Sequence, residues 1–498
     1  MKKFFFALPL MLLFACGVGE HKKEGIDYLG QTPPGSEAVL FAPGIVSTDS
    51  FEHSSPVFSP DGTVVLWNIV SRLEPDYLLE ATYENGKWSA PHKPSFSDTT
   101  ADDYYPGFSA DGRTLYFSSR RQVPHGYHGN NMRIWQVERT ANGWGTPKPI
   151  DSAISKGTEY AHSVTREGEF YFSTSSDWNI HNGTEVMPFG INSVDYEDGA
   201  LIAPDESFLI FESQRAEGIN GSIDLYVSFK LDDNTWTLPM NMGSMINTEK
   251  TERLAKLSPD GKYLFFGSDR DVKAPAWGFD LYWIDAAIID KLRREPGANI
   301  PIERPLGDHL IHALANNDLV ESARLLKEWV SKYPNDMEGV RVYIQTLRKQ
   351  ENFSVGEEVI AGVPSEWMNS RMFAMEVALT KFGLRKDDEA VSMTEPLLVS
   401  SDEQQSTYFQ LINGLQDMHL YDQADRYFER LLALGIHPVH IYNRACFYAK
   451  AGEKDRAFNL LRRASDSGYN ETSQFENDTD LASLKTDPRW SQLLKTLK

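Results

Sequence analysis

Ionisable side chains recur at one fixed position in this sequence. His53, Asp103, Glu159, Glu197 and Glu252 each stand nine residues ahead of a turn residue, which is Gly62, Gly112, Gly168, Glu206 and Gly261 in that order. Further acids, Glu52, Asp102 and Asp198, flank them. Such a set can hold a divalent cation, bind a cationic or sugar ligand, or supply an acid/base pair. It can instead tie neighbouring segments together through hydrogen bonds from backbone amides.

The turn residues belong to a repeated segment. LSPDGKYLFFGSDR (257–270) has counterparts at 58–72, 108–121, 164–177 and 202–215, with turn residues 50, 56, 38 and 55 positions apart. Each copy has a turn, Pro-Asp-Gly in its clearest form, followed by a strand of alternating apolar and aromatic residues. Three copies are followed by a further predicted strand, at 132–140, 224–231 and 280–286, and a Trp-x-x-Pro element recurs at 88–91, 144–147 and 236–239. Four strands per unit, repeated at this spacing, are typical of a β-propeller blade.

The repeat resembles a known family. Its S-P-D-G-x-x-Φ-x-F-x-S/D-R pattern, over residues 38–290, is similar to the TolB-type, WD-like propeller repeat, and the stretch DNTWTLPMNMGSMINTEKTERLAKLSPDGKYLFF resembles bacterial lipoproteins of that group. The resemblance implies a propeller over 37–286 with five blades, or six if a degenerate blade lies within 178–200. The segment EAVLFAPGIV (37–46) is expected to complete the last blade, which removes both open sheet edges.

In such a propeller, the five recurring residues lie where one blade crosses to the next, around one mouth of the central channel. The predicted site is therefore a ring of His53, Asp103, Glu159, Glu197 and Glu252 that binds a ligand. The family repeat carries an acid there in almost every blade, which favours the structural interpretation of this ring.

Other candidate residues point less clearly to chemistry. His125 and His128 are spaced as a metal pair, but no third ligand is near in sequence and a solvated loop is favoured. Arg120, Arg121, Arg215, Arg270 and Trp277 would suit an anionic or carbohydrate ligand, although arginines that close such repeats more often pair with the repeat aspartates. No catalytic residue, metal or cofactor is assigned.

Two enzyme classes are disfavoured by their motifs. The sequence has no G-x-S-x-G motif, and its C-terminal third lacks the strand–helix alternation that an attached hydrolase domain needs. Ser109–Thr114 is similar to the structural turn of sialidases but lacks one residue between the aspartate and the glycine.

The C-terminal third is predicted to be helical. Residues 287–305 indicate a short helix and a Pro/Gly-rich linker, and 306–498 have helical periodicity. Small residues recur at intervals of 33 or 34, at Ala323, Gly356, Ala390, Ala424 and Ala457. This spacing resembles tetratricopeptide repeats, which implies a superhelical array with a concave surface for a peptide segment.

The N-terminus predicts export. Lys2 and Lys3 precede a short apolar run that ends at Cys16 and resembles a bacterial lipobox, so residues 1–16 are expected to be a signal peptide with Cys16 lipidated and 17–36 a tether. Gly17 stands where an aspartate retains enterobacterial lipoproteins at the inner membrane, which favours an outer-membrane anchor facing the periplasm. The net charge of −22 argues against nucleic-acid binding.

Together these patterns predict a multidomain protein, an all-β propeller followed by an all-α array. The predicted function is a lipid-anchored periplasmic scaffold that binds a protein or peptide partner, in envelope assembly as the likeness to TolB-type proteins implies. The alternative is a carbohydrate-binding protein or glycoside-cleaving enzyme that uses the acidic mouth. Carboxyl pairs in an open pocket would support hydrolysis, whereas carboxylates engaged by neighbouring amides would oppose it.

Overall fold

The computed structural model describes residues 25–122, 132–141, 143–150, 154, 159–218, 223–272, 278–399, 404–435, 437–469 and 471–496. Cys16, His125, His128 and Trp277 lie outside these ranges. The chain divides into two compact units, Met1–Asp318 and Leu319–Lys498. No helix in the described ranges is long and apolar enough to cross a membrane.

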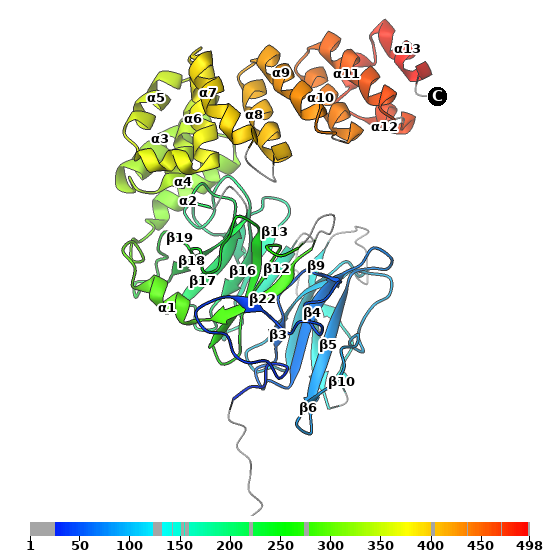
Figure 1. Cartoon of the computed structure of the whole chain (residues 1–498), viewed down its shortest axis with the longest axis vertical. Coiled ribbons are helices and arrows are strands. Elements are labelled where there is room, and N and C mark those ends of the chain that lie inside the picture. Colours follow the sequence, from blue (N-terminus) through cyan, green and yellow to red (C-terminus); the bar gives the residue numbers. More distant parts are fainter. Residues whose placement is uncertain are drawn as a thin grey trace, which may run out of the picture. The chain divides into compact units, whose positions relative to one another are not determined.

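The first unit is a five-bladed β-propeller (Figure 1). Each blade is an antiparallel sheet whose first strand in the chain is the innermost, except that β1 joins the fifth blade. The first two blades contain β2 (Phe51–Glu52), β3 (Val57–Phe58), β4 (Val64–Val70), β5 (Tyr77–Glu84) and β6 (Lys87–Trp88), then β7 (Asp103–Phe108), β8 (Thr114–Ser119), β9 (Arg133–Thr140), β10 (Gly143–Trp144) and β11 (Lys148–Pro149).

The remaining blades have four strands each. The third contains β12 (Glu159–Val164), β13 (Phe170–Thr174), β14 (Ile180–Asn182) and β15 (Glu185–Val186), and the fourth β16 (Glu197–Ile202), β17 (Phe208–Ser213), β18 (Asp224–Phe229) and β19 (Met240–Asn241). The fifth contains β20 (Glu252–Leu257), β21 (Tyr263–Ser268), β22 (Asp280–Asp285) and β1 (Val39–Leu40). Residues 178–200, the place considered for a sixth blade, contribute β14, β15 and the start of β16.

The fifth blade is closed as predicted, because the N-terminal strand β1 pairs with β22. The chain before it differs from the prediction. Tyr28 and Leu29, assigned to a tether, are buried in an aromatic core with Phe58, Phe265 and Trp283. The Tyr28 hydroxyl also donates to Asp260 Oδ1 at 2.7 Å. The apolar residues of this segment therefore extend the propeller towards the N-terminus.

The repeated turns explain the conspicuous aspartates. In the fifth blade, Gly261 has φ +71°, and Glu206 adopts φ +58° at the equivalent place in the fourth. Asp260 Oδ1 accepts from Ser258 Oγ at 2.8 Å, and Ser258 Oγ in turn accepts from the Tyr263 amide at 2.9 Å. The aspartate thus closes its own turn, as Asp61 and Asp111 do in theirs.

Two helices belong to the first unit, α1 (Ala287–Arg293) and α2 (Arg304–Ala315). The predicted linker between them lies along the fourth blade, where Ile302 donates its amide to the Trp236 carbonyl at 2.8 Å. In α2, Gly307 accepts at 3.1 Å from the amide of Phe189, which lies between the third and fourth blades. The helical region was predicted to begin at residue 306, and α2 spans that position within the propeller unit.

The second unit is a run of helices (Figure 1). They are α3 (Leu319–Lys332), α4 (Met337–Lys349), α5 (Phe353–Ala361), a 3-10 turn at Ser365–Asn369, α6 (Arg371–Gly383), α7 (Asp387–Val399), α8 (Gln404–Asp417), α9 (Tyr421–Leu432), α10 (Pro438–Lys450), α11 (Lys454–Asp466), α12 (Thr472–Asn477), a 3-10 turn at Ala482–Leu484 and α13 (Pro488–Thr496).

The regularly spaced small residues lie near the start of α3, α5, α7, α9 and α11. Ala390, Ala424 and Ala457 are fully buried, and their helices pack against α6, α8 and α10. A small side chain at this place lets two consecutive helices approach closely. The positions therefore mark the second helix of successive pairs.

Candidate functional site

The predicted acids stand at the start of the innermost strands. Asp103, Glu159, Glu197 and Glu252 are the first residues of β7, β12, β16 and β20, and each is at most 2% exposed. In the first blade the equivalent residue is Glu52, which pairs with Ile69 as Asp103 pairs with Ser119. His53 lies one residue further on because the bulge of that inner strand contains one residue more than the bulge of β7. Glu52, rather than His53, therefore occupies the register position of the other four acids, and His53 is its neighbour.

These five side chains, Glu52, Asp103, Glu159, Glu197 and Glu252, are called the inner-strand carboxylates. Glu197 shows how they are held. It accepts from the Ser193 amide at 2.8 Å, the Ser193 hydroxyl at 2.7 Å and the Ser213 hydroxyl at 2.8 Å. Arg215 Nη2 lies 3.3 Å from Glu197 Oε1. The same arrangement recurs around Glu252, with Thr248, Ser268 and Arg270.

The arginines at the ends of the repeats join these carboxylates to the crossings between blades. Arg215 donates to the carbonyls of Gly190 and Ile191 at 2.9 and 2.7 Å, on the segment that leads from the third blade into the fourth. Arg121 contacts Asp103 at 2.6 Å and the Phe96 carbonyl at 2.9 Å in the same way. These arginines were expected to pair with the repeat aspartates, and they pair with the inner-strand carboxylates instead.

Burial raises the pKa of Asp103, Glu197 and Glu252, although their arginines oppose the shift. Glu52, Glu197 and Glu252 accept from a backbone amide four residues earlier, at Thr48, Ser193 and Thr248. This is the arrangement expected of carboxylates that tie blades together, and it argues against glycoside cleavage by the ring. The serine or threonine four residues before each glutamate is visible in the sequence and would have indicated the role.

Residues next to the inner-strand carboxylates in sequence contact a different set of side chains at the channel mouth. Asp102 lies 3.3 Å from Arg120, whereas Asp198 accepts from the Tyr196 hydroxyl at 2.6 Å. The His53 ring contacts Tyr104, Tyr105 and Phe279. No group of three or more His, Cys, Asp or Glu side chains placed to hold a metal ion is found among the residues that the structure describes.

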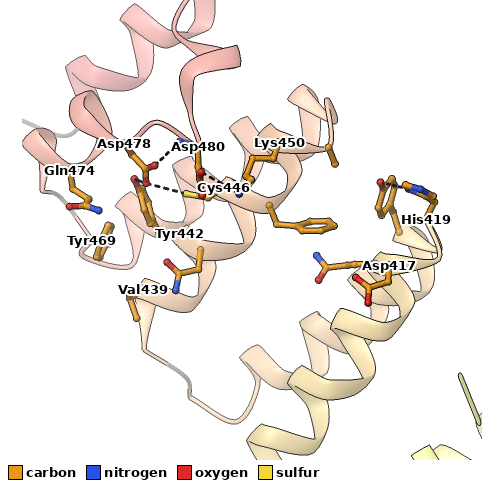
Figure 2. Close-up of a pocket in the computed structure, with 15 residues that line it drawn as sticks. Asp417, His419, Val439, Tyr442, Cys446, Lys450, Tyr469, Gln474, Asp478 and Asp480 are labelled. Carbon is orange, nitrogen blue, oxygen red and sulfur yellow. Dashed lines mark hydrogen bonds and ion pairs between the residues drawn. The ribbon is translucent and has the colours of Figure 1, made fainter. Parts of the chain in front are cut away.

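The helical unit contains a groove along α8, α10 and α12 (Figure 2). Two hollows of about 690 and 280 Å³ share Gln416, Asn443 and Phe447 in their walls, so they form one continuous surface. The labelled side chains of α10, among them Tyr442, Cys446 and Lys450, lie between Asp417 and His419 on one side and Gln474 and Asp478 on the other. This surface is called the array groove.

Helical spacing positions its side chains. Asn413 and Gln416 are three residues apart on α8, and Asn443, Phe447 and Lys450 follow at intervals of four and three on α10, so each set shares one helix face. The amide side chains of Asn413, Gln416, Asn443 and Gln474 have no hydrogen-bond partner in the described chain. Gln416 is only 5% exposed, although it lines both hollows. Its amide atoms are not among the buried polar atoms that lack a partner, so the amide is open to the groove and can bond to a ligand there.

The charges around the array groove are mostly negative. Asp417, Asp478 and Asp480 line it against two cations. Lys450 lies 3.4 Å from Asp480, and the buried Arg444 lies 2.7 Å from Asp425. Burial would raise the pKa of Asp478, but hydrogen bonds from the Tyr442 hydroxyl at 2.8 Å, the Asp480 amide and the Cys446 thiol together outweigh it, so the pKa is lowered. Burial raises the pKa of Cys446 to about 12, so its thiol stays protonated and unreactive. The groove therefore offers hydrogen bonds and negative charge rather than a nucleophile.

Similarity to known proteins does not identify a function for this chain. No family model and no curated protein matches the sequence. A protein of unknown function from Dyadobacter fermentans is similar over 54% of this chain and 86% of its own, at 14% identity and a TM-score of 0.32. TolB from Acinetobacter baumannii is similar over 47% of this chain, with 14% identity and a TM-score of 0.28, and the match spans only 50% of TolB. TM-scores this low carry no inference about function.

Proposed function

We propose that the protein is a scaffold whose array groove binds an extended peptide segment of a partner protein. The observation that carries the proposal is Gln416, which lines both hollows and whose amide has no hydrogen-bond partner within the described residues. An extended peptide presents alternating N–H and C=O groups, and a carboxamide both donates and accepts. The carboxamides of Asn413, Asn443 and Gln474 line the same groove and can form similar hydrogen bonds with a peptide.

The composition of the groove restricts the peptide. Phe409, Tyr442, Phe447 and Tyr469 supply apolar faces between the amides, so the segment carries apolar or aromatic side chains as well as polar ones. Three carboxylates line the groove with Lys450 and Arg444, and Arg444 is already paired with Asp425, so the remaining negative charge favours a segment with Lys or Arg. The N-terminal motif supports the further proposal that lipidated Cys16 holds the scaffold on the periplasmic face of the outer membrane. Retention of the chain in the membrane fraction, and its release by Cys16→Ser, tests that anchor.

A display library of random linear peptides, selected against the full-length protein, tests the groove. We expect enriched sequences that contain Lys or Arg beside apolar residues, and affinity that falls as ionic strength rises. Gln416→Ala and Asn443→Ala are each expected to weaken a selected peptide about fivefold to tenfold, since each removes about one hydrogen bond. Gln423→Ala on α9, which does not line the groove, is the matched control and should bind normally. Peptides that bind all these variants equally would contradict the proposal.

A further inference from the structure

Side chains from all five blades meet in a closed circuit at the channel mouth. The circuit, called the mouth ring, consists of His53, Tyr105, Tyr160, Trp178, Tyr196, Arg253 and Phe279. Ring centroids are 5.6 Å apart for His53 and Tyr105, 6.2 Å for Tyr105 and Tyr160, 6.1 Å for Tyr160 and Trp178, and 5.1 Å for Trp178 and Tyr196. Arg253 Nη2 lies 3.3 Å from the Tyr196 hydroxyl, and the Arg253 guanidinium stacks on Phe279. The ring centroids of Phe279 and His53 are 6.3 Å apart, which closes the circuit.

Trp178 is the member most open to solvent. It is 40% exposed, which is unusual for so large an apolar side chain. Its backbone has φ +53°, a left-handed conformation that costs a bulky residue about 1–2 kcal/mol. Two hydrogen bonds hold it there: its amide donates to the Thr174 carbonyl at 2.9 Å, and its carbonyl accepts from the Glu197 amide at 3.0 Å. The strand that carries an inner-strand carboxylate therefore also fixes the tryptophan.

Arg253 of the mouth ring forms a polar cluster with Glu212 and Asp198. Some polar atoms of this cluster have no hydrogen-bond partner within the described residues. Arg253 Nε lies 3.2 Å from Glu212, and its Nη2 lies 3.8 Å from Asp198. Glu212 is fully buried, and neither of its carboxylate oxygens has a hydrogen-bond partner within the described residues. His53 Nδ1 is also without a partner there. Donors and acceptors thus converge beside the aromatic faces.

The charges favour a neutral ligand. A cationic ligand would meet Arg253, and an anionic one would meet Asp198. Burial raises the pKa of Glu212 to about 8, so this carboxyl adds a hydrogen-bonding group more than a charge at neutral pH. A polyhydroxylated ligand can donate to the carboxylates, accept from the guanidinium and stack its C–H face on an aromatic ring. We propose that the mouth ring binds a neutral carbohydrate, with a sugar ring against Trp178 and hydroxyls directed to Arg253 and Asp198. This site lies in the propeller and is independent of peptide binding by the array groove.

Titration of the full-length protein with maltohexaose and with cellohexaose, followed by tryptophan fluorescence and calorimetry, tests the proposal. We expect at least one hexasaccharide to bind. Trp178→Ala should weaken binding about tenfold or more, whereas Trp178→Phe retains an aromatic face and should stay close to wild type. Tyr160→Ala is a second variant with the same expected loss. Trp88→Ala, in strand β6 of the first blade, removes an indole away from the mouth ring and should bind normally.

Three results would overturn the proposal. The first is that neither hexasaccharide gives a signal with the wild-type protein. The second is that Trp178→Ala and Tyr160→Ala bind as tightly as wild type, which would place binding elsewhere. The third is that choline chloride binds in their place and loses affinity in Trp178→Ala, which would make the ring an aromatic cage for cations.

Discussion

Glu52 differs from the other inner-strand carboxylates in its partners. Asp103, Glu197 and Glu252 each contact an arginine, whereas within the described residues Glu52 accepts from the amide and hydroxyl of Thr48 and contacts no arginine. Its Oε2 atom is buried and has no hydrogen-bond partner in the part of the chain that the structure describes. Burial accordingly raises the pKa of Glu52 from 4.5 to about 7, with the Thr48 hydrogen bonds opposing the shift.

This shift predicts a pH dependence of stability. The folded state binds the proton of Glu52 more tightly than the unfolded state, so the stabilisation is complete below pH about 4.5 and is lost as the pH rises through about 7. Glu52→Gln stays neutral. We therefore expect its stability relative to wild type to increase by about 2–3 kcal/mol between pH 5 and pH 8. Urea unfolding at the two pH values measures this change.

Glu252→Gln is the matched variant. It leaves Arg270 without its carboxylate, so we expect it to be destabilised at pH 8, where Glu52→Gln gains. A stability difference for Glu52→Gln that is the same at both pH values would contradict the assignment.

At the residue scale the sequence identifies the position of the carboxylates but not their exposure. The turn register locates four of the five inner-strand carboxylates, and it misses Glu52 because the longer bulge after it leaves no trace in the turn spacing. The mouth ring was not predicted, since Trp178 and Tyr196 lie outside the repeated segments and meet only when neighbouring blades pack together. Contacts between blades have no periodic signature in the chain.

At the scale of elements, helix packing gives opposite predictions for two glycines. A Cβ on Gly414 of α8 would lie 2.5 Å from Leu379 Cδ1 and 3.1 Å from its Cγ, and Leu379 is itself buried. A Cβ on Gly356 of α5 would meet Thr380 at an ordinary 3.4 Å. We expect Gly414→Ala to destabilise the helical unit by about 1–3 kcal/mol through overpacking. Gly356→Ala should be neutral or stabilise it by up to about 1 kcal/mol, because alanine favours the helix.

Thermal unfolding of the two variants checks this contrast, since they make the same chemical change in two helices of one unit. Equal shifts would contradict it. The regular spacing of small residues located α5, because Gly356 occupies a regular position between Ala323 and Ala390. Gly414 stands outside that series, and only the packing of α8 on Leu379 explains it.

In the propeller as well, the sequence predicted single elements but not how several of them pack together. The N-terminal strand was predicted because it supplies what the last blade lacks, and β1 indeed pairs with β22. Residues 26–29 were assigned to the tether because a few apolar residues among polar ones have no periodicity. Their burial beside Phe58 and Trp283 depends on the completed first and fifth blades. Patterns within one element could be predicted from the sequence, and surfaces completed by several elements could not.

At the scale of the whole molecule, each of the two units contains hydrophobic core clusters of its own. The largest core cluster of the helical unit joins residues from Met375 to Leu493, and the clusters that contain Phe265 and Ile284 lie within the propeller unit. Separate cores allow separate unfolding, so we expect two calorimetric transitions rather than one.

Variants in each unit can assign the two transitions. Val39 pairs with Trp283 at the closure of the propeller, and its side chain is 43% exposed, so Val39→Pro disturbs the strand backbone with little loss of packing. It should lower only the propeller transition, by about 2–4 °C per kcal/mol lost, whereas Gly414→Ala should lower only the other. Val39→Ala keeps the amide and should shift the propeller transition less than Val39→Pro does. A single transition that both variants lower together would mean that the two units unfold as one cooperative body, in which case a ligand at the mouth ring would also stabilise the array groove.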